Sequence, residues 1–320
     1  MTSNEALSAS VWRDHQDLGA IGNYARRKHR SIGRMIAGAV VLLLLALFGL
    51  SVANAKFDWS VVRTYLVNGQ ILGGIERTLL LTVLAMLVGL VLGTLGGVCR
   101  LSRNPVVSGV AWLYVWFFRG TPVLVQLLLW FNLSLIFPHL SIPGLFSVSM
   151  NSVITPMVAA MLGLGVNEGA YLSEIVRGGI SAVDEGQREA ALAIGSSHFH
   201  MTRRIILPQT LRIILPTLGN ETIGMLKFTS LASVVSFQEL LATSEQIYYV
   251  NARVMELLIV VTVWYLVMTS VLTIAQYYLE RHVGRSLQRG RPRSIVERLI
   301  VQLLESRRER RARADAEAGA

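Results

Sequence analysis

Six long apolar stretches dominate the sequence, and each is close to the length that a helix needs to cross a bilayer. About 20 helical residues cover the roughly 30 Å of hydrocarbon in a membrane. The second, fourth and fifth stretches also contain polar residues, which makes their limits less sharp. The pattern predicts an all-α integral membrane protein with about six transmembrane helices. The stretches run approximately over residues 35–53, 71–98, 110–137, 153–176, 209–234 and 255–279.

Composition favours a membrane protein over a soluble one. Apolar residues make up 52% of the 320 residues and charged residues only 16%, whereas soluble domains carry about 25% charged residues. Two soluble domains would fit the length but not this composition. The single cysteine, Cys99, excludes a disulfide framework.

Basic residues predict the orientation in the membrane. The chain has 30 basic and 20 acidic residues, and most basic residues precede the first stretch, follow the last or lie in the second and fourth connections. Because basic loops stay in the cytoplasm, both termini are predicted to be cytoplasmic, with a basic tail over 1–34 and an Arg-rich tail over 281–320. The positive excess is therefore assigned to topology, and no nucleic-acid partner is expected.

The first apolar stretch has two interpretations. Residues 35–55 fit an extra transmembrane helix that precedes the others. The small residues Ala53, Asn54 and Ala55 also resemble a signal-peptide cleavage site, although the basic region before them is long for a signal peptide. Retention of this helix is favoured, and cleavage stays open.

Gly89, Gly93 and Gly97 recur at four-residue spacing in the second stretch. Small residues at this spacing let two helix backbones approach closely inside a membrane. Packing within one subunit and a seam between two subunits both fit the pattern.

The C-terminal tail contains a second amphipathic pattern. Its apolar residues fall on one helical face, which predicts either a helix on an anionic lipid surface or one packed on another protein. They are Ile295, Val296, Leu299, Ile300, Leu303 and Leu304.

The sequence contains no arrangement typical of an enzyme. No phosphate-binding loop of the form G-x-x-x-x-G-K-[ST] is present, so the chain is not expected to hydrolyse ATP or to bind a cofactor. His198 and His200 are two apart and would point to different faces of a helix, and no third ligand is nearby. No metal site and no catalytic residue are therefore predicted.

The fourth connection, residues 184–208, has a sequence pattern that predicts secondary structure rather than an irregular loop. Glu189 begins a short segment rich in small helix-forming residues, Gly195 interrupts it, and Pro208 stands at the start of the fifth stretch. A small-residue helix that projects from the membrane and then bends is suited to enter a groove on another protein.

At these residues the sequence resembles the permease subunits of ATP-binding-cassette importers. The family signature is Glu-Ala-Ala, three residues, Gly, nine residues, Ile, one residue and Leu-Pro. It is present here as Glu189, Ala190, Ala191, Gly195, Ile205, Leu207 and Pro208. Further matches resemble the polar amino-acid branch. They include Phe118-Arg119-Gly120-Thr121-Pro122, Arg177-Gly178-Gly179-Ile180, Gly219-Asn220 and Leu226-Lys227 with Thr229-Ser230-Leu231-Ala232-Ser233.

The resemblance covers residues 70–280 and implies a five-helix type I permease core in a bacterial inner membrane. It implies a second permease subunit, identical or different, and two cytoplasmic ATPases that hold ATP and Mg and dock on the 184–208 loop. It also implies a binding protein that delivers a polar amino acid from outside, and transport by alternating access.

Ionisable residues within the apolar stretches suggest a transport pathway, because they are costly there. An amino acid carries an ammonium and a carboxylate, so Glu168 and Lys227 are predicted to line the cavity, with Asn220, Thr229 and Ser230 nearby. An ion pair that joins the fourth and fifth stretches is the alternative. Phe228 departs from the acidic or amide residue that the family usually has after the lysine.

Two other functions compete with this interpretation. A secondary transporter would show inverted repeats and broken helices in matching halves, and neither is evident in the sequence. A non-transporting scaffold would leave the Glu-Ala-Ala spacing unexplained. The sequence does not specify which amino acid is carried.

Overall fold

The computed structural model describes residues 32–54, 58–142 and 146–284. The chain divides into two compact units, Met1–Phe57 and Asp58–Ala320. In the first unit the described element is α2 (Ile32–Asn54). The possible cleavage site at Ala55, most of the 1–34 tail and the amphipathic pattern beyond residue 284 lie outside the described residues.

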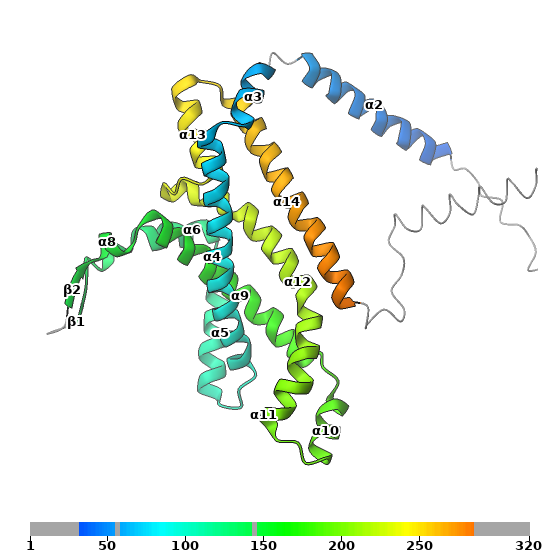
Figure 1. Ribbon diagram of the computed structural model, residues 1–320, viewed down its shortest axis with the longest axis vertical. Helices are drawn as coiled ribbons and strands as arrows, with labels where there is room; N and C mark the ends of the chain where they lie inside the picture. The colour runs from blue at the N-terminus through cyan, green and yellow to red at the C-terminus, as the bar shows by residue number, and fades with distance from the viewer. Residues whose placement is uncertain (1–31, 55–57, 143–145, 285–320) are drawn as a thin grey trace, which may run out of the picture. The chain divides into compact units, whose positions relative to one another are not determined.

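The second unit is built around α4 (Gly69–Arg100) and α9 (Pro156–Ser181), which lie side by side (Figure 1). Asn68 and Thr155 begin these helices, since each side chain accepts a hydrogen bond from a backbone N–H of the first turn. A proline in the first turn of α9 fits the same start, where its missing N–H is not needed.

Four further helices belong to this unit. They are α3 (Trp59–Leu66), α12 (Leu207–Phe228), α13 (Leu240–Asn251) and α14 (Val254–Gly284). Asp58 caps α3, and its hydrogen bonds from Ser60 hold the pKa of this carboxyl below its usual range. A 3₁₀ segment, η2 (Thr229–Val235), joins α12 to the turn before α13.

The third apolar stretch, 110–137, was predicted as one span, and in the structure it is not a single straight helix. It folds as α5 (Pro105–Gly120) and α6 (Val123–Phe131), with a bend of 103° between them. Pro122 causes the break, because it has no N–H to donate and forces Thr121 into an extended conformation. The Gln126 side chain donates to the carbonyls of Phe118 and Thr121, which compensates the interrupted helix.

The prediction of an all-α fold needs a second correction. After α7 (Leu133–Ile136), β1 (His139–Ile142) pairs antiparallel with β2 (Phe146–Ser149), and α8 (Met150–Val153) follows. His139 is opposite Ser149 in this hairpin. The hairpin is short, and the described fold is otherwise helical.

Two described helices, Gly69–Arg100 and Val254–His282, are long and apolar enough to cross a membrane, and the bent α5–α6 pair is a third if counted as one span. The predicted fourth and fifth spans correspond to α9 and α12, which are long but contain polar residues. The total of six spans and the cytoplasmic position of both termini stay predictions.

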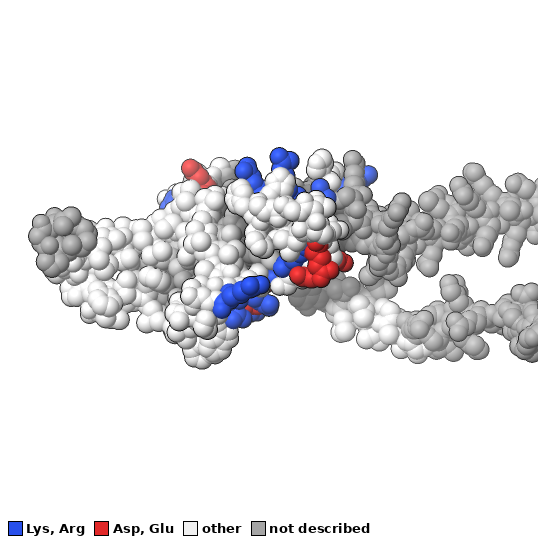
Figure 2. Space-filling model, turned by 90° about the horizontal axis from the view of Figure 1, so that it is seen from below, with Lys and Arg blue, Asp and Glu red and all other residues white. Residues whose placement is uncertain are grey.

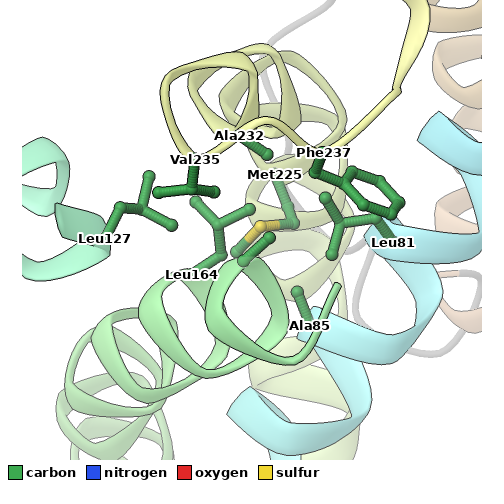
Figure 3. Close-up of a cluster of buried hydrophobic side chains, with 9 residues drawn as sticks. Leu81, Ala85, Leu127, Leu164, Met225, Ala232, Val235 and Phe237 are labelled. Atoms are coloured by element: carbon green, nitrogen blue, oxygen red, sulfur yellow. The ribbon is translucent and has the colours of Figure 1, made fainter. Parts of the chain in front are cut away.

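The main core lies where α4, α6, α9, α12 and η2 meet (Figure 3). Its side chains come from segments far apart in the sequence, which fixes η2 against the long helices. The labelled members are Leu81, Ala85, Leu127, Leu164, Met225, Ala232, Val235 and Phe237.

Candidate functional site

The predicted 184–208 loop folds as two short helices at the end of this unit opposite α3 and α13 (Figure 1). These are α10 (Glu185–Ala193) and α11 (His198–Met201). A π-helical turn, η1 (Thr202–Ile206), then runs directly into α12. The loop is thus continuous with the helix that carries Lys227.

Gly195 ends α10 in a Schellman motif. Its φ is +75°, and its N–H donates to the carbonyl of Leu192 while the N–H of Ser196 donates to that of Ala191. A side chain at this φ is strained, so the sequence needs glycine here. The predicted bend after α10 therefore has a local backbone cause.

The Glu-Ala-Ala signature divides between two faces of α10. Ala191 is buried against Val183, Met201 and Ile206, whereas Glu189 and Ala190 are exposed. Of the other signature residues, Ile205 packs partly against the same buried cluster, and Leu207 and Pro208 are exposed at the start of α12. One signature position thus holds the loop together while others remain accessible to a partner.

Exposed apolar side chains surround this end of the molecule. Ile194 is 83% exposed and Phe199 is 74% exposed, and Leu192 is also exposed. Ile194 and Leu192 were not predicted as contact residues, although both lie within three residues of Glu-Ala-Ala.

A basic cavity lies next to this apolar edge. It has a volume of about 290 Å³ and is lined by Phe199, His200, Arg203 and Arg204. Viewed from below, charged side chains gather at a few places on a largely uncharged surface (Figure 2). The basic side chains that line the cavity, Arg203 and Arg204, complement an acidic surface on a partner.

Gly89, Gly93 and Gly97 all face α9 of the same chain. A Cβ on Gly89 would approach the Cγ of Glu168 at 2.9 Å, and one on Gly97 would approach the Ser173 carbonyl oxygen at 2.8 Å. A Cβ on Gly93 would collide with Leu172. Because partner positions on α9 rise in step with those on α4, the two helices run parallel.

Two α9 glycines complete this contact. A Cβ on Gly165 would approach Val88 at 2.8 Å, and one on Gly169 would approach Leu92 at 2.7 Å. The close approach is therefore built from both helices, and the sequence analysis identified only the α4 half.

Glu168 is buried beside this glycine contact. Its side chain is 5% exposed, and its Oε1 atom has no hydrogen-bond partner among the described residues. The hydroxyl of nearby Tyr114 donates instead to the Val166 carbonyl, at 2.7 Å. A buried carboxylate without a partner is a strong candidate for binding a cation.

Lys227 is exposed near the end of α12, and the ion pairs among the described residues include neither Lys227 nor Glu168. Asn220 accepts a hydrogen bond from Gln276 of α14. Thr229 is fully buried and donates to the Leu226 carbonyl, at 2.6 Å. Among the described residues, no hydrogen bond or ion pair joins Glu168 to Lys227, and the shared cavity stays a prediction.

Ser230 donates to the carbonyl of Lys227, at 2.7 Å, and is half-buried. This bond supports the backbone at the point where α12 changes into η2. The hydroxyls of Thr229 and Ser230 thus stabilise the last turn of α12, which carries Lys227.

A buried polar cluster around Glu239 was missed by the sequence analysis. Glu239 is fully buried and caps α13, accepting hydrogen bonds from the N–H groups of Leu241 and Ala242 and from the hydroxyl of Tyr265. Thr78 of α4 accepts from the N–H of Leu240, at 3.1 Å. The cluster joins α4, α13 and α14. Its sequence signal is weak, because glutamate is not among the favoured N-cap residues.

A second polar group lies between α4, α5 and α9. Glu174 pairs with Arg100 at 3.3 Å and with Arg177 at 2.7 Å, and the Arg119 guanidinium lies 5.0 Å from the centre of the Tyr171 ring. A cavity of about 470 Å³ lies between these side chains. This contact with the Tyr171 ring accounts for the position of the Arg119 guanidinium.

Comparisons with known proteins agree with this architecture. Residues 85–285 match the family described as binding-protein-dependent transport system inner membrane component. The arginine transport system permease protein ArgU of Corynebacterium glutamicum is 42% identical over 280 residues, which cover 87% of each chain. The glutamine transport system permease protein GlnP of Escherichia coli is 35% identical over 228 residues, or 71% of this chain and 98% of the relative.

A solved structure of an amino acid ABC transporter with histidines superimposes with a TM-score of 0.62. It is 35% identical and covers 71% of this chain and 99% of its own. The family match spans more than half of the chain, and the relatives share the region that contains the loop and the α4–α9 contact. The chain therefore belongs to the family of binding-protein-dependent transport system inner membrane components.

Proposed function

We propose that the chain is the membrane-spanning subunit of an ATP-driven importer for polar amino acids, and that it forms the translocation pathway. The observation that carries this proposal is the exposed loop of α10 and α11, which has the complete Glu-Ala-Ala signature and the glycine-dependent bend. The named functions of the relatives, arginine and glutamine transport, support a polar amino acid as the substrate.

The loop would couple the membrane part to a cytoplasmic ATPase dimer. Ala191 ties α10 to its buried base, and Glu189, Leu192 and Ile194 remain exposed for contact with the ATPase. A contact can drive a conformational change only if it is stronger in one state than in the other. ATP and Mg would reside on the partner subunits, and this chain would bind no cofactor.

The pathway would pass between two permease subunits, identical or different, in the bacterial inner membrane. Glu168 would meet the ammonium group of the amino acid, and Lys227 would meet its carboxylate. Glu168 supports this role because its Oε1 is buried without a partner, and Lys227 does so because it is exposed and unpaired among the described residues. Thr229 and Ser230 would support the backbone around Lys227, and Asn220 would join α12 to Gln276 of α14.

The test is uptake by the assembled complex, with the ATPase and an extracytoplasmic binding protein, in proteoliposomes. ATP-dependent uptake of L-arginine, L-glutamine or another polar amino acid is expected, and no uptake across such a panel would contradict the proposal. Glu189→Ala is expected to uncouple ATP hydrolysis from uptake, with Gln187→Ala on the same helix as its control. Unchanged coupling in Glu189→Ala would contradict the role of the loop.

The pathway is tested separately. Lys227→Met is expected to reduce uptake by about tenfold or more, since it removes a charge-assisted hydrogen bond. Lys227→Arg, which keeps the charge, serves as the matched variant. Normal uptake and normal preference among amino acids in Lys227→Met would remove Lys227 from the pathway.

A further inference from the structure

A polar cavity lies between α4 and α13, at the end of the unit that is opposite the α10–α11 loop (Figure 1). Its volume is about 420 Å³, which is within the range of small-molecule sites. Its polar lining consists mainly of side chains that can both donate and accept hydrogen bonds. These are Tyr65, Gln70, Gln238, Gln246 and Asn251.

Among the described residues that line this cavity, Arg77 alone carries a charge. Its Nε donates to the Gly73 carbonyl, at 3.0 Å, which holds the guanidinium against α4. No described ion pair or hydrogen bond engages its two Nη atoms. This half-buried guanidinium lines the cavity and has free N–H groups. It can therefore donate two parallel hydrogen bonds to a carboxylate.

The cavity is held open by contacts on both sides. At its inner end α4 and α13 meet closely, because a Cβ on Gly74 would approach the Leu240 Cα at 3.0 Å. At its outer end Asn251 donates to the hydroxyl of Tyr65, at 3.1 Å, which ties α13 to the segment before α4. Arg77 lies about 10 Å further along α4 than Gln70, at a rise of about 1.5 Å per residue.

We infer that this cavity is an intermediate binding site for the amino acid. In it, Arg77 binds the substrate carboxylate before the substrate reaches Glu168 and Lys227. The inference rests on the proposed function and adds a second carboxylate site to it. Gln238, which lines the cavity, directly precedes Glu239 in the segment that connects to η2 and Lys227.

The described lining offers the ammonium group only neutral oxygen atoms, because it contains no carboxylate. Binding should therefore be weak. Weak binding suits a transport pathway, where each site must release its ligand to the next.

The experiment measures protection of a cysteine at the mouth of the cavity. Cys99 is the only cysteine in the sequence, so Cys99→Ser provides a background for Val250→Cys, which replaces an exposed apolar residue of the lining. The rate of labelling by a water-soluble thiol reagent is measured on the purified permease–ATPase complex without the binding protein. The probes are L-arginine and L-argininamide, which differ only in the carboxylate.

L-Arginine is expected to slow the labelling about fivefold at saturation, whereas L-argininamide should have little effect. Arg77→Gln should raise the concentration for half-protection by about tenfold, the loss of a hydrogen bond to a charged group. Arg77→Lys should restore part of the protection. Size-exclusion elution with the ATPase verifies that each variant is folded.

Equal protection by both probes, or undiminished protection in Arg77→Gln, would overturn the inference. Equal protection of a cysteine outside the cavity, Ser147→Cys, would also overturn it, because it would indicate a general change rather than occupancy. Acetate as a third probe distinguishes a general anion site from one that needs the amino acid, and protection by acetate alone would overturn the inference. Failure of the complex to take up any amino acid would instead contradict the proposed function.

Discussion

Glu168 of α9 packs its side chain against the bare backbone of Gly89 on α4, where a Cβ would approach the glutamate Cγ at 2.9 Å. The glycine therefore makes room for a carboxylate that has no partner at its Oε1 atom. A close contact between two helices thus adjoins a buried carboxyl group with an unpaired oxygen. The same glycine therefore sets both the helix packing and the space around this carboxyl group.

Gly93→Ala is expected to destabilise the protein by about 1–3 kcal/mol, because the added methyl group would overlap Leu172 and force α4 and α9 apart. Unfolding of the purified chain in mixed detergent micelles measures the effect. Gly109→Ala on α5 is the control, since nothing lies within 4 Å of its added methyl group. Equal stability of the two variants would contradict the close packing.

Gly195→Ala is expected to cost about 1 kcal/mol in stability, because alanine is strained at a φ of +75°. The larger effect should be on coupling, measured as uptake per ATP hydrolysed. Gly195→Asn should recover part of the loss, because asparagine tolerates the left-handed region. Gly178→Ala, with open space and an ordinary φ, is the control. If alanine and asparagine behaved alike, the Schellman motif would not be the reason for this glycine.

Glu239→Ala is expected to cost about 2–3 kcal/mol, because it leaves buried N–H groups at the start of α13 without an acceptor. Tyr265→Phe removes only one of the hydrogen bonds to Glu239 and should cost about 1 kcal/mol. Combining the two changes should give less than the sum of their separate effects. Strict additivity in thermal unfolding would show that the two side chains are not coupled.

Ile194→Ser should leave the stability of the chain within about 0.5 kcal/mol, because this side chain is already exposed. It should weaken association with the ATPase by about tenfold, the loss of one buried aliphatic contact at an interface. Val67→Ser, at an exposed site near α3, is the matched control. Titration of the ATPase against the reconstituted chain measures the affinity. Undiminished affinity would exclude Ile194 from the interface.

Hydropathy in the sequence anticipates the long helices well. The second stretch, 71–98, corresponds to α4 at Gly69–Arg100, and the last corresponds to most of α14. The interruption at Gly195 was also visible, since a glycine after a run of helix formers is a local signal. These features depend on residues that are close together in the chain.

Features that depend on distant partners were not visible in the sequence. The break at Pro122 lies within a strongly apolar run, and the amide of Gln126 that compensates it reads as an ordinary polar residue. Glu239 is recognisable as a buried cap only when Tyr265 and Thr78 are placed beside it. Thr229 looked like a pathway residue, but its burial depends on how η2 packs.

The parallel contact between α4 and α9 has a mechanical consequence. Backbones that touch through glycines on both sides have little freedom to slide, because close-packed interiors transmit displacement rather than absorb it. We therefore expect α4 and α9 to move together as one rigid body whenever the subunit changes conformation.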